Sequence, residues 1–284
     1  MKILLTGGTG FIGSYVLLEL LQAGHEIVAT RRTGSTPILH IDRQPTWLED
    51  PLQNLKDKDL EGIDLVIHLA SAGVSPQKAS LQDFQEVNVA AGLQLIKLAY
   101  DAGVRRFIAA GTCHEYGSEA EVWERIPPNA ALRPITLYGA SKAAGFMLLH
   151  AFATTNPIEL LYCRIFNVYG EGQFSENLWP SLRQSAIAGD DFAMSTGEEI
   201  RDFIPVVDVA RYLRIGAERD DLVPGYPLVV NIGSGTGIRV VDFAMQQWRH
   251  FGAKGILMPG AIPSRSCSIS RLVADTIYLE PIKA

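Results

Sequence analysis

The chain of 284 residues is 47% hydrophobic and 20% charged, a composition that can bury the core of one sizeable globular unit with a small second lobe. Its net charge of −6, without a long run of Lys or Arg, disfavours general nucleic-acid binding and favours a small-molecule partner. Apolar stretches are too short for a membrane span or a signal peptide, so we expect a cytoplasmic protein that binds no membrane.

Apolar runs of strand length alternate with amphipathic stretches over the first 165 residues. The expected strands are Lys2 to Leu5, Glu26 to Thr30, Asp64 to Leu69, Arg106 to Ala110 and Glu159 to Ile165. The expected helices are Phe11 to Ala23, Leu81 to Ala102 and Ile135 to Thr154. Since such alternation is typical of βαβ units, we predict an α/β fold with a doubly wound parallel sheet of the Rossmann type.

The regularity weakens after residue 166, where Gly and Pro become more frequent. Short elements are expected around Asn177 to Ala188 and Val240 to Phe251. We predict a dinucleotide-binding domain over residues 1–165, with returning segments near 203–234. Residues 166–202 and 235–284 are expected to form a smaller, C-terminal substrate-binding lobe.

A glycine-rich segment lies between the first expected strand and the first expected helix. Gly7 permits a tight turn, Gly10 lets backbone N–H groups approach a pyrophosphate, and Gly13 lets helix and strand pack closely. In this context the pattern indicates a dinucleotide site, although a turn without a ligand remains the alternative. The expected cofactor contacts in this segment are Gly7, Thr9, Gly10, Phe11, Ile12 and Gly13.

The residues after the second expected strand bear on the choice of cofactor. NAD-binding sheets usually place Asp or Glu there to bind the ribose 2′-hydroxyl, whereas this chain has Arg31 and Arg32. Because guanidinium groups suit a 2′-phosphate, we predict NADP, used as NADPH, with NAD as the less favoured cofactor. The alternative is that one of these arginines only solvates a loop.

Tyr138 and Lys142 are four positions apart in the third expected helix and therefore share a helix face. The ammonium group of Lys142 is expected to lower the pKa of the phenol from about 10 toward the working pH. Tyr138 can then exchange a proton with a carbonyl or alcohol oxygen. An isolated Tyr-x-x-x-Lys pair is more often a surface pair, so the prediction depends on the upstream glycine motif and Thr112.

The order of these motifs resembles the extended short-chain dehydrogenase/reductase family of the NAD-dependent epimerase/dehydratase type. The resemblance covers nearly the whole chain and implies an NAD(P)-dependent oxidoreductase or epimerase that acts on nucleotide-diphosphate sugars. It is carried by Thr6–Gly13, His68–Ala70, Tyr116–Gly117, Tyr138 with Lys142, Arg164–Gly170, Arg201–Phe203, Val207–Val209 and Asn231–Gly235.

The resemblance also implies roles for single residues. Lys142 would bind the nicotinamide ribose, and Thr112 would orient the substrate oxygen. Further cofactor contacts are implied at Leu69, Ala70, Ser71 and Ile165. Substrate contacts are implied at Asn167, Asn177, Arg201 and Arg265, with Arg271 as a rival to Arg265. The family's usual homodimer, a four-helix bundle, is expected as well.

The segment from Gly111 to Gly117 bears on the reaction. Related dehydratases follow the Thr with Asp and Glu, and this chain has Cys113 and His114 there, which disfavours a dehydratase. His114 occupies the place of the first acid/base of the 3,5-epimerases, but the second falls on Asn177, which cannot cycle a proton. His114 is therefore either an acid/base that titrates near neutrality or a wall of the sugar pocket.

We expect NADPH-dependent reduction of a nucleotide-linked 4-keto-6-deoxy sugar to the 4-hydroxy sugar, with Tyr138 as proton donor. Arg31 and Arg32 favour a reductase because a 4-epimerase usually keeps NAD bound. The alternatives are a nucleotide-sugar 4-epimerase and a 3,5-epimerase/reductase. Two further alternatives are a reductase of a non-sugar carbonyl and a non-catalytic NADP sensor.

The cysteines and histidines give no indication of a metal. Cys113, Cys163 and Cys267 are widely spaced, without a Cys-x-x-Cys pair. The histidines outside the motifs also lack the spacing of metal ligands. We expect no metal site and a reducing compartment.

Overall fold

A computed structural model describes residues 1–49, 52–74, 79–263 and 269–276. Its central layer is a seven-stranded sheet in the order β10-β6-β5-β4-β1-β2-β3, and all neighbouring strands are parallel. The strands are β1 (Lys2–Thr6), β2 (Glu26–Thr30), β3 (Thr46–Leu48), β4 (Leu65–His68), β5 (Arg106–Thr112), β6 (Glu159–Ile165) and β10 (Leu228–Ile232). The predicted Rossmann-type fold is confirmed.

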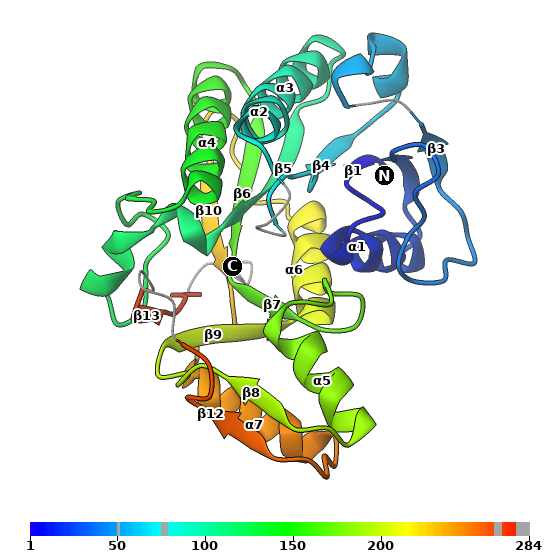
Figure 1. The fold of residues 1–284 in the computed structure, drawn as a ribbon. Coiled ribbons are helices and arrows are strands. Elements are labelled where there is room, and N and C mark those ends of the chain that lie inside the picture. The colour runs from blue at the N-terminus through cyan, green and yellow to red at the C-terminus, as the bar shows by residue number, and fades with distance from the viewer. Residues whose placement is uncertain (50–51, 75–78, 264–268, 277–284) are drawn as a thin grey trace.

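Helices cover both faces of this sheet (Figure 1). On one face, α1 (Phe11–Gln22) and α6 (Val206–Glu218) pack with apolar residues such as Leu17 and Leu213. On the other face, α3 (Ala91–Asp101) and α4 (Leu137–Thr155) bury residues that include Ile96 and Leu149. Strands covered on both faces explain the nearly unbroken apolar runs of the sequence.

The helix expected over Leu81 to Ala102 is not continuous. A short α2 (Leu81–Asp83) leads into a π-helical segment (Phe84–Ala90) and then into α3. Within the π-helical segment, Asn88 accepts hydrogen bonds from Ala72 N (2.8 Å) and Ser71 Oγ (3.0 Å) and donates one to Ser141 Oγ (2.9 Å). The wider turn thus places one amide side chain between the loop after β4 and helix α4.

Apart from α6 and β10, the described chain after β6 forms a smaller body beside the carboxyl ends of the central strands (Figure 1). It contains a four-stranded sheet and a two-stranded parallel pair, β8 with β12. Helices α5 and α7 pack together through Leu182 and Trp248. The elements are β7 (Asn167–Tyr169), α5 (Leu178–Ala188), β8 (Phe192–Met194), β9 (Ile200–Pro205), β11 (Gly237–Arg239), α7 (Val240–His250), β12 (Leu257–Pro259) and β13 (Arg271–Leu272).

None of the helices within the described ranges is long and apolar enough to cross a membrane.

Candidate active site

The glycine turn between β1 and α1 is built for close backbone contact. Gly7 has φ +74°, and a Cβ there would lie 2.8 Å from the backbone nitrogen of Ala70. A Cβ on Gly13 would overlap the Gly7 carbonyl oxygen. The N-cap of α1, Gly10, makes no side-chain cap hydrogen bond, which leaves the first-turn N–H groups of the helix for an anion.

The predicted catalytic side chains come together where β5 ends against α4. Thr112 is the last residue of β5 and the N-cap of a short 3₁₀ turn (Cys113–Glu115), where its hydroxyl accepts from His114 N at 3.3 Å. The rings of His114 and Tyr138 are in edge contact, with centroids 6.0 Å apart. Lys142, one turn further along α4, is buried and donates to Ala110 O at 2.7 Å.

The titration of Tyr138 differs from the expectation. Burial raises the pKa of Tyr138 to about 12, and hydrogen bonding from Thr112 and Ser71 only partly opposes this. Burial also lowers the pKa of Lys142, whose ammonium group is directed at the Ala110 carbonyl. The predicted lowering of the phenol's pKa is therefore wrong for this structure, because desolvation outweighs the stabilisation of the phenolate.

His114 lies at the mouth of the site and keeps part of its surface exposed. Desolvation of its ring, together with the positive charge of Arg201, lowers its pKa. The lowered pKa favours the neutral imidazole, which can donate or accept a hydrogen bond. This state suits a wall of the sugar pocket better than an acid.

Arg201 lies half-buried on β9, and burial lowers its pKa. The next residue, Asp202, is fully buried and accepts hydrogen bonds from Ser234 N (2.6 Å), Gly235 N (3.0 Å) and Ala274 N (3.1 Å). Asp202 thus ties β9 to the two segments beside it. This anchoring holds Arg201 on a rigid strand near His114.

The other predicted substrate residues are distributed around this body. Asn167 begins β7 and donates to Asp202 O at 3.3 Å. Asn177 is the N-cap of α5, and its side chain makes no cap hydrogen bond. Arg265 lies outside the described residues. Its rival, Arg271, donates to Glu124 O at 2.8 Å.

The predicted cofactor residues after β4 and β6 line the carboxyl edge of the sheet. Ala70 N donates to Thr6 Oγ1 at 3.2 Å, and Leu69 N donates to Thr6 O at 3.2 Å. Ser71 is held by Asn88, and Ile165 pairs with Thr112 across β5 and β6. These contacts bring the loop after β4 onto the glycine turn, as a doubly wound nucleotide site requires.

The adenosine end of the sheet does not present two free arginines. Arg31 Nε donates to Glu49 Oε1 at 3.0 Å, and its guanidinium stacks 4.9 Å from the Trp47 ring centroid. Arg32 is exposed. Sequence reasoning missed Glu49, which reaches Arg31 because β3 pairs with β2. The expectation that both arginines grip a 2′-phosphate therefore lacks support from this geometry.

A small cavity of about 10 Å³ lies behind Lys142, bordered among others by His68 and Asn88. This is about the space that one water molecule needs. His68 donates to or accepts from Thr6 Oγ1 at 2.8 Å, and burial lowers its pKa to about 3. A neutral His68 thus adds no positive charge beside Lys142.

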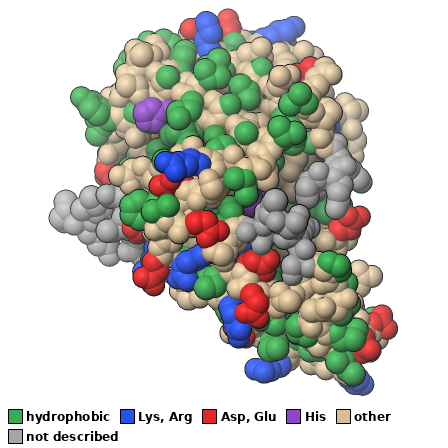
Figure 2. All heavy atoms as spheres, turned by 60° about the vertical axis from the view of Figure 1, so that its left-hand side comes forward, with side chains coloured by type: hydrophobic (Ala, Val, Ile, Leu, Met, Phe, Trp, Pro, Cys, Tyr) green, Lys and Arg blue, Asp and Glu red, His purple; other side chains and the backbone are tan. Residues whose placement is uncertain are grey.

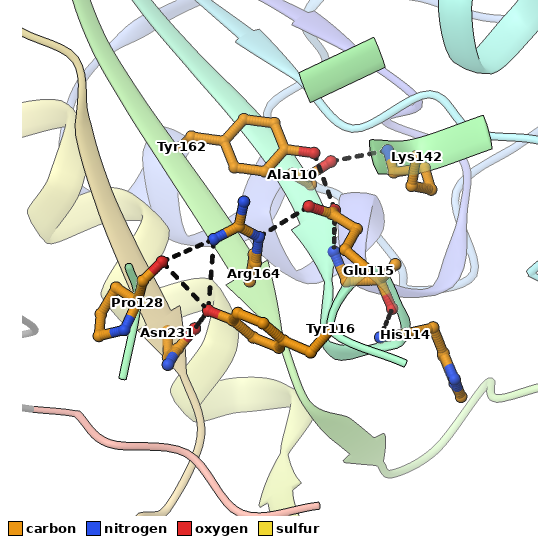
Figure 3. A network of polar contacts seen from close by, with 10 residues as sticks. Ala110, His114, Glu115, Tyr116, Pro128, Lys142, Tyr162, Arg164 and Asn231 are labelled. Carbon is orange, nitrogen blue, oxygen red and sulfur yellow. Dashed lines mark hydrogen bonds and ion pairs between the residues drawn. The ribbon is translucent and has the colours of Figure 1, made fainter. Parts of the chain in front are cut away.

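A buried polar network beneath the site was missed by the sequence analysis. Glu115 and Arg164 form an ion pair of 2.7 Å with side chains 0% and 2% exposed. Figure 3 shows this pair between Lys142 on one side and Pro128 and Asn231 on the other. Two signals were present in the sequence: the capping-box spacing from Thr112 to Glu115, and an arginine within an apolar strand.

The residues present fit a dinucleotide. The glycine turn forms a cradle that side chains would fill, and the helix behind it offers uncapped N–H groups. No cluster of three or more His, Cys, Asp or Glu side chains that could hold a metal ion occurs within the part of the chain that the structure describes.

Several known proteins are similar to this chain. The chain is 29% identical to a UDP-glucose 4-epimerase of Neisseria meningitidis serogroup B, over 98% of this chain and 90% of the relative. It is 27% identical to a dTDP-6-deoxy-L-talose 4-dehydrogenase (NAD(+)) of Aggregatibacter actinomycetemcomitans, over 74% and 77%. The solved structure of MoeE5 with UDP-glucuronic acid and NAD is similar, with 28% identity, a TM-score of 0.83 and coverage of 98% and 91%.

The model of the NAD dependent epimerase/dehydratase family matches residues 3–233, which include both the glycine turn and the Tyr138–Lys142 helix. This chain therefore belongs to the NAD dependent epimerase/dehydratase family, within the extended short-chain dehydrogenase/reductases.

Proposed function

We propose that this protein is an NAD-dependent nucleotide-sugar 4-epimerase that acts on a UDP-linked hexose. The observation that carries the proposal is the convergence of Thr112, Tyr138 and Lys142 at the carboxyl edge of a complete dinucleotide fold. The similarity to a UDP-glucose 4-epimerase over 98% of the chain favours this reaction. This was the alternative of the sequence analysis, and it now has more support than the 4-ketoreductase.

The proposed mechanism assigns each side chain one task. As the phenolate, Tyr138 would take the proton of the C4 hydroxyl, and the phenol so formed would later return a proton to the C4 oxygen. Thr112 holds that oxygen, and Lys142 binds the ribose of the cofactor and stabilises the phenolate. When bound, the dinucleotide supplies the acceptor and donor of the C4 hydride. His114 and Arg201 bind the sugar and the diphosphate.

The cofactor we propose is NAD rather than the NADP expected from the arginine pair. In support, the structure of MoeE5 contains NAD, and the guanidinium of Arg31 already forms an ion pair with Glu49. A carboxylate at that place also repels a 2′-phosphate. Arg32 then serves as a surface residue.

The second candidate remains the 4-ketoreductase. The similarity to a dTDP-6-deoxy-L-talose 4-dehydrogenase favours it, because that enzyme's named reaction interconverts an alcohol and a ketone at the same carbon. The two functions need the same Tyr138, Lys142 and Thr112. They differ in whether a reduced cofactor is consumed in each turnover.

The test uses purified protein incubated with UDP-glucose and NAD, without any reductant, and NMR of the sugar product. Accumulation of UDP-galactose to an equilibrium mixture supports the epimerase. Absence of product, together with oxidation of NADPH when a 4-keto-6-deoxy sugar nucleotide is offered, would replace the epimerase with the ketoreductase.

We also propose that the chain works as a homodimer, with the lobe from residues 166–202 and 235–284 covering the substrate. The support for a dimer is apolar exposure along α4, where Leu137, Met147 and Leu148 are 64%, 58% and 40% exposed. Figure 2 brings forward the side of the molecule on which α4 lies, and hydrophobic side chains are spread over the upper part of this face. Light scattering of the purified protein tests this directly.

A further inference from the structure

The Glu115–Arg164 pair lies at the carboxyl ends of β5 and β6, directly beneath the candidate site. Glu115 Oε1 accepts from Thr112 N at 2.8 Å and from Tyr162 OH at 2.9 Å, while Oε2 accepts from Arg164 Nε at 2.7 Å. Every one of these donors is buried. The carboxylate is therefore fixed by three hydrogen bonds, one of them to the backbone of Thr112.

Arg164 is in turn held from the far side. Its Nη1 donates to Pro128 O at 2.8 Å, and its guanidinium lies 4.4 Å from the centroid of the Phe146 ring on α4. Tyr116 OH accepts from Arg164 at 3.3 Å and donates to Asn231 Oδ1 at 2.6 Å (Figure 3). The arginine thus positions Glu115 through contacts that do not touch Thr112.

Gly111 leaves the space that this arrangement needs. A Cβ at Gly111 would overlap the Tyr162 ring and lie 2.6 Å from Glu115 Oε1. Any side chain there would push the carboxylate away from the Thr112 amide. The Tyr162 ring and the Glu115 carboxylate together leave room only for a glycine before Thr112.

The carboxylate also acts electrostatically on the two catalytic groups of α4. Its negative charge opposes the effect of burial on the pKa of Lys142, and it raises the pKa of Tyr138. In a buried site such charges are poorly screened. The titratable or charged groups that its charge affects are Cys113 and Tyr116 on its own turn, Tyr138 and Lys142 on α4, and Tyr162 and Arg164 on β6.

We propose that Glu115 is a positioning residue of this active site, which fixes Thr112 through its backbone amide. The inference rests on the proposed function, because it assigns Thr112 and Lys142 to the reaction. A capping-box glutamate with a merely structural role would stabilise the 3₁₀ turn and hold Arg164 without affecting the chemistry.

The decisive variant is Glu115→Gln combined with Arg164→Met. Removing one partner alone leaves a buried unpaired charge and threatens folding, whereas replacing both with neutral residues of similar size is often tolerated. Because the carboxylate raises the pKa of both Lys142 and Tyr138, its removal lowers both. We expect the alkaline limb of kcat, which loss of the Lys142 proton sets, to move to lower pH. We expect kcat at neutral pH to fall roughly tenfold or more while KM changes little.

The matched control is Glu159→Gln combined with Arg106→Met. This second ion pair, with a separation of 2.6 Å, joins the same two strands at their amino ends, away from the site. It should leave both kcat and the alkaline limb unchanged. If the Glu115→Gln/Arg164→Met enzyme matches this control in both measurements, Glu115 is structural only and the proposal is overturned.

A milder variant, Tyr162→Phe, and a second measurement, hydrogen exchange of the Thr112 amide, give a test that needs neither the double variant nor a substrate. Tyr162→Phe removes one donor to Glu115 Oε1, and it should quicken hydrogen exchange of the Thr112 amide roughly tenfold, because that amide depends on the same oxygen. An unchanged exchange rate would contradict the positioning role. Failure of the wild type to convert any sugar nucleotide would count against the proposed function, and the exchange experiment would still show whether Glu115 holds the Thr112 amide.

Discussion

The two ends of the carboxyl edge of the central sheet each carry an ion pair, one buried and one exposed. Beneath the catalytic end, Glu115 and Arg164 are almost fully buried, and each hydrogen bonds to partners on more than one element. At the adenosine end, Arg31 and Glu49 have side chains 24% and 46% exposed and are held mainly by each other. A buried pair can adopt only one arrangement without a large penalty, whereas an exposed pair is worth about 0–1 kcal/mol and can exchange partners.

This difference explains why the placement of Thr112, Tyr138 and Lys142 was easier to predict than the surroundings of Arg31. Tyr138 and Lys142 lie on one helix and Thr112 ends a strand, and the sequence predicts both of these elements. The role of Arg31 depends on which exposed side chain pairs with it. That partner, Glu49, directly follows β3, a three-residue strand that the sequence analysis did not predict. The following predictions test the contrast between the two ends.

The largest effect is expected at the catalytic end, from Tyr138→Phe. Loss of the proton-exchanging hydroxyl should lower kcat roughly a thousandfold, the range of a positioned acid or base. NAD binding, measured by calorimetry, should stay near that of the wild type. Tyr100→Phe, on α3, is the control. A Tyr138→Phe enzyme with more than a tenth of normal kcat would assign the proton transfer elsewhere.

Gly13→Ala tests the rigid backbone that joins the two ends. The added methyl group would overlap the Gly7 carbonyl oxygen, so the turn must open. We expect a loss of about 1–3 kcal/mol in the free energy of unfolding and a parallel loss of NAD affinity. In Gly8→Ala the nearest atom is 3.4 Å away, and stability should change much less. Equal denaturation midpoints for the two variants would contradict the model of the turn.

Arg201→Ala tests a charge whose exposure lies between that of the buried pair and that of the exposed pair. Loss of the guanidinium should raise KM for the sugar nucleotide roughly tenfold, as expected for a hydrogen bond to a charged group. The dissociation constant for NAD should stay the same. Arg249→Ala, on the exposed side of α7, is the control and should leave KM unchanged. A larger effect on NAD than on the sugar nucleotide would refute the assignment.

The smallest effect is expected from Glu49→Gln at the exposed pair. Freed from the carboxylate, Arg31 can meet a 2′-phosphate, so the preference for NAD over NADP should weaken by a few-fold, the scale of an exposed ion pair. Titration of wild type and variant with both dinucleotides measures this. Wild-type protein that binds NADP more tightly than NAD would restore the original cofactor prediction.

The sequence predicts the central sheet well because its strands are buried on both faces and therefore appear as nearly unbroken apolar runs. Glu159 to Ile165 is predicted to the residue, and the helix from Phe11 ends within one residue of its expected end. The prediction of one continuous helix over Leu81 to Ala102 is wrong at the π-helical segment. That segment depends on hydrogen bonds between Asn88 and residues distant in sequence.

The candidate site is predictable only where a motif carries the geometry. The spacing of Tyr138 and Lys142 fixes their common face, but the burial that raises the pKa of the phenol arises from packing against β5 and β6. Likewise, the sequence around Glu115 predicts only a helix cap. The fold places Arg164, 49 positions later, beside it. Long-range contacts of this kind leave little trace in a single sequence.

The most direct test of the proposed epimerase uses UDP-glucose deuterated at C4, incubated with the NAD-loaded protein. Our account predicts UDP-galactose that retains deuterium at C4, without consumption of reduced cofactor, because the hydrogen removed from the sugar returns to the same sugar. A 4-hydroxy product whose C4 hydrogen comes from added NADPH would contradict the account and establish a reductase.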